Sequence, residues 1–283
     1  MAFTLTRVIL RIFLTTIGLL ILFIMLYPII FIILQSMYSK ASLLIDLNDV
    51  FANLTFENYF RSITSPGFLE AVYTSLIVTI STIIVSLVVI TPAAYSFSRF
   101  YFKGRDTLLY IYLILSQAGG GFGIIAIIAL LMFLLIMSGY GIPLFGTHIL
   151  PFIYTAGLVP FQTWLLKSYF DNLPKELDEA AFIDGANWFT IIFKVILPSS
   201  KPAMIIITLF AFMSAWSEFF IANLLRITTV GAYIFRTAFG ARGLQDPSLY
   251  AALSIIYAIP IIIIYIVAQK YIGEAYRMGI VKG

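Results

Sequence analysis

Residues 8–37 read VILRIFLTTIGLLILFIMLYPIIFIILQSM, an almost unbroken apolar run that contains a single charge, Arg11. A helix that crosses the hydrocarbon core of a bilayer needs about 20 apolar residues. The run exceeds that length, and it is also longer than the apolar core of a signal peptide. It therefore predicts a retained membrane-spanning helix.

Apolar residues dominate the remainder of the chain as well. Of 283 residues, 61% are hydrophobic and 11% are charged, whereas a soluble domain usually has about 25% charged residues. One globule of this size cannot hide so much apolar surface, so part of it must meet lipid. Apolar runs predict further spans at 71–96, 108–137, 149–166, 204–225 and 251–271. The predicted fold is all-α, a polytopic protein with six transmembrane helices forming a single transmembrane domain over 1–283.

The charges predict the orientation of this domain and exclude several functions. Twelve of the 17 lysines and arginines fall on the side that holds both termini. The chain is therefore expected in the cell membrane with both of its ends in the cytoplasm. No acid lies in the middle of a predicted span, which argues against a proton-coupled carrier. With no cysteine and one histidine, neither a metal site nor a catalytic residue is predicted. No basic run indicates nucleic acid.

Residues 168–202 are the most polar connection between predicted spans. Pro174 is suited to the first turn of a helix, where its missing N–H matters least. Three acids follow at the positive end of that helix, and Asp184-Gly185 predicts a sharp turn. A second short helix is expected from about Asn187 to Ile196, ending before Pro198. The connection therefore predicts a compact helix–turn–helix on the cytoplasmic face.

The spacing of this block resembles a known motif. Glu179-Ala180-Ala181, three residues, Gly185, nine residues, Val195, one residue and Leu197-Pro198 follow the EAA loop of ABC importer permeases, in which isoleucine usually stands where Val195 does. Segments 161–167, 214–219 and 278–283 are similar to the sugar-importing branch of that family, and in particular to its maltose G-type inner-membrane subunit.

The resemblance implies a type I ABC importer permease fold and a non-catalytic subunit without a cofactor of its own. The chain has no phosphate-binding loop, so ATP and magnesium are expected on partners. Those partners are a second permease subunit, two ATPase subunits and an extracytoplasmic substrate-binding protein that delivers a sugar. The residues implied to couple to the ATPase are Glu179, Ala180, Ala181, Phe182, Asp184, Gly185, Ala186, Leu197 and Pro198.

The expected function is ATP-driven import of a mono- or oligosaccharide by alternating access. An importer of the same family for a polyol or a glycerol-phosphate-like solute is the alternative. A stand-alone secondary carrier is a further alternative, although it does not need a cytoplasmic docking block.

Two clusters are candidates for the translocation path. The first has two interpretations. Each glycine in a helix costs about 1 kcal/mol relative to alanine, so the cluster is a broken helix that lines the path in one interpretation. In the other interpretation, the cluster allows close packing of helices. Its members are Gly119, Gly120, Gly121 and Gly123.

The second cluster lies toward the outer end of the span at 204–225 and comprises Trp216, Glu218 and Asn223. Trp216 offers an apolar face to a sugar ring in one interpretation. In the other, which we favour, the tryptophan is an interfacial anchor and the glutamate makes a structural hydrogen bond. Beyond this span, the resemblance suggests that a loop with Arg226, Arg236 and Arg242 reaches the binding protein, a solvated loop being the alternative.

Overall fold

The structure is a computed structural model that describes residues 2–42, 45, 50–142, 144–239 and 246–280. Within helices, the side chains of 2–6, 50, 117–124, 272 and 274–280 are not described. The described residues form helices and connections, with one isolated bridge between Tyr38 and Leu54. They fall into two compact units, one of Met1–Leu69 and Ile234–Ile259, the other of Glu70–Tyr233 and Pro260–Gly283.

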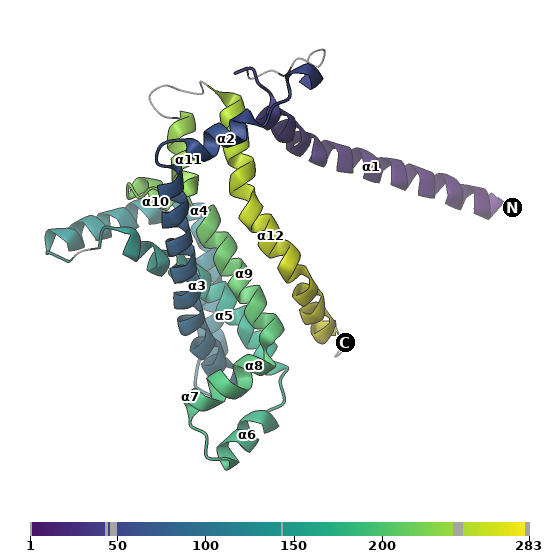
Figure 1. Ribbon diagram of the computed structural model, residues 1–283. Coiled ribbons are helices and arrows are strands. Elements are labelled where there is room, and N and C mark those ends of the chain that lie inside the picture. The colour runs from purple at the N-terminus through teal and green to yellow at the C-terminus, as the bar shows by residue number, and fades with distance from the viewer. Residues whose placement is uncertain (1, 43–44, 46–49, 143, 240–245, 281–283) are drawn as a thin grey trace. The chain divides into compact units, whose positions relative to one another are not determined.

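The long helices confirm an all-α membrane protein (Figure 1). Five segments are long and apolar enough to cross a bilayer: Arg7–Met37, Phe68–Arg99, Thr147–Asp171, Lys201–Leu224 and Pro247–Tyr271. The predicted span at 108–137 lies within one helix, α4 (Arg105–Gly139). The side chains in the middle of α4 are outside the described ones, so the count of six spans stays a prediction.

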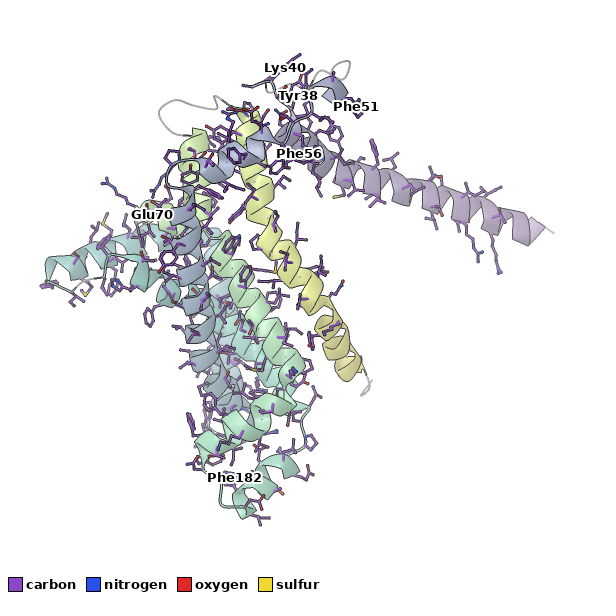
Figure 2. All side chains as sticks on the ribbon, in the orientation of Figure 1. Tyr38, Lys40, Phe51, Phe56, Glu70 and Phe182 are labelled. Carbon is purple, nitrogen blue, oxygen red and sulfur yellow. The ribbon has the colours of Figure 1, made fainter. Side chains whose placement is uncertain are left out.

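The first unit contains α1 (Ala2–Met37), the 3-10 turn η1 (Val50–Asn53) and α2 (Glu57–Thr64). It also contains the end of α11 (Val230–Phe239) and the start of α12 (Pro247–Ile280). Side chains 7–30 of α1 are all exposed, as the sticks in Figure 2 show. Gln35 at the end of α1 donates hydrogen bonds to the Ser42 carbonyl (2.8 Å) and to Ser248 Oγ (2.9 Å). These bonds join the start of α12 to the end of α1.

The second unit is built around α3 (Phe68–Arg99), α5 (Leu150–Asp171) and α9 (Lys201–Ser217). Helices α5 and α9 pack against each other, all three helices contribute to one buried cluster, and Ser86 Oγ and Thr155 Oγ1 lie 3.1 Å apart between α3 and α5. Figure 1 shows α3, α5 and α9 in the same part of the second unit. One buried apolar cluster also receives side chains from the connection that follows α5. That cluster comprises Ile90, Ala94, Tyr95, Leu166, Phe170, Ala181, Ile191, Ile196, Ala203 and Ile207.

The helix breaks differ from the expected ones. The backbone of α4 is helical through Gly119, Gly120, Gly121 and Gly123, so of the two interpretations given for these glycines the broken helix was wrong, and their role in the translocation path stays a prediction. Water is absent from the bilayer core, and a break would leave backbone groups without partners, which outweighs the low helix propensity of glycine. The span expected over 204–225 is broken instead, since α9 ends at Ser217 and α10 covers Phe220–Leu224.

The connection after α5 contains α6 (Glu176–Ile183) and then a second helix from Trp188 to Ser199. That second helix consists of α7 (Trp188–Thr190), a π-helical segment η3 (Ile191–Ile196) and α8 (Leu197–Ser199). The expectation that it stops before Pro198 was wrong. The π segment has i→i−5 bonds and ends two residues before Pro198, a residue that cannot donate the α-helical bond.

Candidate coupling site

The two faces of α6 have different environments. Asp178 and Ala181, three residues apart, are buried against the rest of the second unit. Glu179 and Ala180 on the other face are exposed, and Ile183 is 87% exposed. Residues three apart share a face of a helix, so α6 is attached along one side and open along the other. The predicted EAA residues are therefore divided between the two faces.

A buried ion pair attaches α6 to the end of α3. The distance between Arg99 Nε and Asp178 Oδ2 is 2.8 Å, and the two side chains are only 7% and 10% exposed. Tyr95 Oη donates a 2.7 Å hydrogen bond to the other carboxylate oxygen, and Arg99 also donates to the Leu173 carbonyl (3.3 Å). Because a buried carboxylate needs such partners, Asp178 fixes the position of α6 relative to α3.

A second set of polar contacts links α3 to the end of α5, directly before α6. Ser98 Oγ donates a 2.7 Å hydrogen bond to Asp171 Oδ1, and Lys167 Nζ lies 2.7 Å from Asp171 Oδ2. Tyr95, Ser98, Arg99 and Asp171 were not predicted as site residues. Most of their partners are distant in sequence, and helix spacing gave a signal only for Asp171, which lies four residues after Lys167. The available indication of these contacts was the pair Ser98 and Arg99, two polar residues in the last turn of α3.

The turn after α6 requires glycine. Gly185 has a φ of +78°, a conformation that costs other residues about 1–2 kcal/mol. Its N–H bonds to the Phe182 carbonyl (3.0 Å), and the next N–H, that of Ala186, bonds to the Ala181 carbonyl (2.9 Å). These two bonds make a Schellman motif that ends α6. Asn187 Oδ1 then accepts from the Thr190 N–H (2.8 Å) and begins the next helix.

Aromatic side chains pack around this turn. The ring of Trp188 makes edge contacts with Phe182 (centroids 4.4 Å apart) and with Phe100 (4.9 Å). Phe182 lies at the α6 end of the second unit in Figure 2. Two large apolar side chains of the block are nevertheless exposed, Ile183 (87%) and Phe189 (70%). We call the exposed side of α6, with Glu179, Ala180 and Ile183, the docking face.

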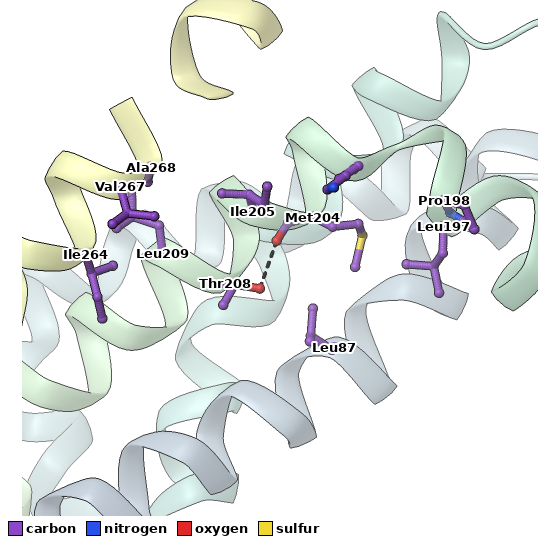
Figure 3. Close-up of a pocket in the computed structure, with 11 residues that line it drawn as sticks. Leu87, Leu197, Pro198, Met204, Ile205, Thr208, Leu209, Ile264, Val267 and Ala268 are labelled. Atoms are coloured by element: carbon purple, nitrogen blue, oxygen red, sulfur yellow. Dashed lines mark hydrogen bonds between the residues drawn. The ribbon is translucent and has the colours of Figure 1, made fainter. Parts of the chain in front are cut away.

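Leu197 and Pro198 lie elsewhere. They line a groove of about 500 Å³ together with Leu87, Lys201, Met204, Ile205, Thr208, Leu209, Ile264, Val267 and Ala268 (Figure 3). The Thr208 hydroxyl donates to the Met204 carbonyl (2.9 Å), so its bonding is local to the helix. These two residues are thus placed on a groove beside α9, and their predicted coupling role stays a prediction.

The residues predicted near the outer end of α9 make structural contacts. Glu218 Oε1 accepts from the Ile221 N–H (2.6 Å) and Oε2 from the Ala222 N–H (3.3 Å), while Tyr154 Oη donates to the same carboxylate. The carboxylate therefore caps the first turn of α10. Trp216 is 4% exposed.

The tryptophan ring is stacked on Phe212, with centroids 5.6 Å apart. Its faces are therefore not open to a ligand in this conformation. Asn223 lies within α10. The role of these residues in the path stays a prediction.

The three arginines predicted to contact a binding protein belong to different parts of the chain, and their predicted role stays a prediction. Arg226 is exposed and follows α10 with a φ of +60°, while Arg236 belongs to α11 in the other unit. Arg242 lies outside the described residues.

Comparison with known proteins places this geometry in a family. Residues 90–277 match the family described as "Binding-protein-dependent transport system inner membrane component". The trehalose/maltose transport system permease protein of Thermococcus litoralis is 35% identical over 242 residues, covering 81% of this chain and 82% of the relative. The maltodextrin transport system permease protein of Bacillus subtilis is 30% identical over 241 residues, covering 83% of each.

A solved structure is also similar. The crystal structure of a bacterial ABC transporter involved in the import of the acidic polysaccharide alginate matches with a TM-score of 0.71 and 26% identity, covering 92% of this chain and 96% of that one. The chain is therefore a multi-pass membrane protein that belongs to the family of binding-protein-dependent transport system inner membrane components.

Proposed function

We propose that this chain is the permease subunit of an ATP-driven importer for a mono- or oligosaccharide. The relatives that support this substrate class are named for trehalose, maltose and maltodextrin, and the similar solved structure takes part in alginate import. The chain is the non-catalytic component. A second permease completes the translocation path, two ATPase subunits bind ATP and magnesium, and an external binding protein delivers the sugar.

The observation that carries the coupling role is the two-sided environment of α6. The inner side is held by the Arg99–Asp178 ion pair (2.8 Å), while the outer side leaves Ile183 exposed. An apolar side chain in this position is suited to a cleft on another protein. An element that is fixed on one side and docked on the other transmits movement in both directions.

In the proposed cycle, ATP closes the ATPase pair and the docked α6 moves with it. The end of α3 follows because Arg99 and Tyr95 hold Asp178, and the spans change from inward-facing to outward-facing. The proposed cycle requires α6 on the cytoplasmic side, and the charge distribution predicts that the two termini lie on the same side.

The test uses the complete transporter, reconstituted in nanodiscs with its binding protein. We expect Ile183→Asp on the docking face to abolish the stimulation of ATP hydrolysis by sugar-loaded binding protein. Tyr140→Asp is the matched control, because Tyr140 is 78% exposed after α4 on the opposite predicted side. Equal stimulation in both variants would contradict docking through α6. A panel of sugars and polyols, screened for thermal stabilisation of the binding protein, identifies the solute class.

A further inference from the structure

Helix α2 (Glu57–Thr64) has an inverted distribution of polar and apolar side chains. Asn58 and Ser62, four residues apart, are 3% and 0% exposed, whereas Phe56, Phe60 and Ile63 are 72%, 70% and 47% exposed. The three exposed residues follow the i, i+4, i+7 spacing of a single helix face. A surface helix of a water-soluble domain has the opposite arrangement, so the aromatic face of α2 requires an apolar environment.

Hydrogen bonds fix which way this helix faces. Asn58 Nδ2 donates to the carbonyls of Ser36 (3.1 Å) and Tyr38 (2.9 Å), and Ser62 Oγ donates to the Asn58 carbonyl (2.7 Å). Tyr59 Oη lies 2.6 Å from Ser36 Oγ. Rotation of α2 to bury its aromatic face would break the contacts that Asn58 and Tyr59 make with residues 36 and 38, and would expose polar groups that are now satisfied. The exposure of the aromatic face is therefore specified by the packing of the opposite face.

The position of α2 along the chain sets its depth. Its polar face contacts residues 36 and 38, where the first spanning helix ends at Met37. Three residues separate Thr64 from Phe68, the first residue of the next spanning helix. Figure 2 shows Phe56 close to Tyr38 at this end of α1. Along the chain, α2 is thus within a few residues of the ends of two predicted spans.

We propose that α2 is an interfacial anchor that lies in the headgroup region of the membrane, on the surface predicted to be outer, with Phe56, Phe60 and Ile63 inserted among lipid chains. The predicted span that precedes α2 also has exposed apolar side chains near its end, since Ile29 and Ile33 of α1 are 53% and 42% exposed. A short helix with one apolar face is suited to such a boundary.

Charged groups lie off the aromatic face. Arg61 Nη2 is 2.8 Å from Asp246 of the same unit, and Glu57 is exposed beside the aromatic face. Lipid contact therefore buries the three apolar side chains without desolvating a charge. The anchor fixes the depth of the connection between the first two spans and does not depend on the identity of the transported solute or on docking of the ATPase.

The absence of cysteine permits a direct test by site-directed spin labelling of the full complex in nanodiscs. Single cysteines replace Phe56, Phe60 and Ile63, with Glu57→Cys and Thr64→Cys as controls on the polar edge of the same helix. Collision of the label with oxygen, which partitions into lipid, is compared with collision with a water-soluble nickel chelate. We expect oxygen to dominate at the three apolar positions and the nickel chelate to dominate at the two controls.

Three other outcomes would overturn the proposal. Nickel access at the apolar positions equal to that at the controls would place the face in water. Protection from both reagents would indicate a partner subunit, and protection that arises only with the binding protein would indicate that protein. Phe60→Trp provides a second measurement and retains an aromatic ring. Brominated lipid should quench the tryptophan fluorescence of this variant more than that of the parent protein, which has three tryptophans. The absence of additional quenching would contradict insertion.

Discussion

The turn at Gly185 allows a prediction in which the magnitude follows from the backbone. Gly185 has a φ of +78°, and a Cβ added there meets nothing within 4 Å. Substitution therefore causes no clash, and the penalty is purely conformational. A non-glycine L residue in this region costs about 1–2 kcal/mol, which lowers the population of the turn roughly 5- to 30-fold. Asparagine adopts the conformation most readily, and a β-branched residue least.

We expect a graded loss of sugar-stimulated ATP hydrolysis and uptake in the order Gly185→Asn, Gly185→Ala, Gly185→Val. Valine should abolish transport, because the Schellman bonds at the end of α6 depend on this conformation. The amount of subunit in the membrane should stay constant, since the turn lies outside the spans. Uptake by the valine variant at the parental rate would refute the coupling role of the turn. Equal defects in all three variants would show that backbone conformation is not the cause.

Two further predictions concern polar contacts of the second unit. Arg99→Met or Asp178→Leu alone should destabilise the purified protein by about 3–5 kcal/mol, because each leaves a buried charge without its partner, whereas the double variant should lose less stability. Thermal unfolding in detergent measures the single and double variants. An additive loss of stability in the double variant would contradict a buried pair. Glu218→Ala should lower the stability by about 1 kcal/mol through loss of the α10 cap, while Glu218→Gln should retain part of the stabilisation by the cap. If both variants are as stable as the parent protein, the cap is contradicted.

The coupling block could be predicted from the sequence because its determinants are local. Pro174, the three acids after it and the Asp184-Gly185 turn each act within a few residues of where they stand. The structure accordingly places α6 at Glu176–Ile183, followed by a glycine of positive φ. The division of α6 into a buried and an exposed face was harder to predict from the sequence. Whether Asp178 is buried depends on Arg99 and on the ring of Tyr95, which only the tertiary packing brings to it.

The helix breaks show why propensity alone failed. Four glycines within five residues made a broken helix one of two interpretations, yet α4 is continuous there, whereas α9 ends before Glu218, a residue with no intrinsic tendency to stop a helix. In a bilayer the deciding quantity is whether freed backbone groups find partners. Glu218 supplies acceptors for two N–H groups of α10, and the glycines have no side chain with which to do the same. A break in a spanning helix should therefore be sought where a polar side chain can cap the exposed end.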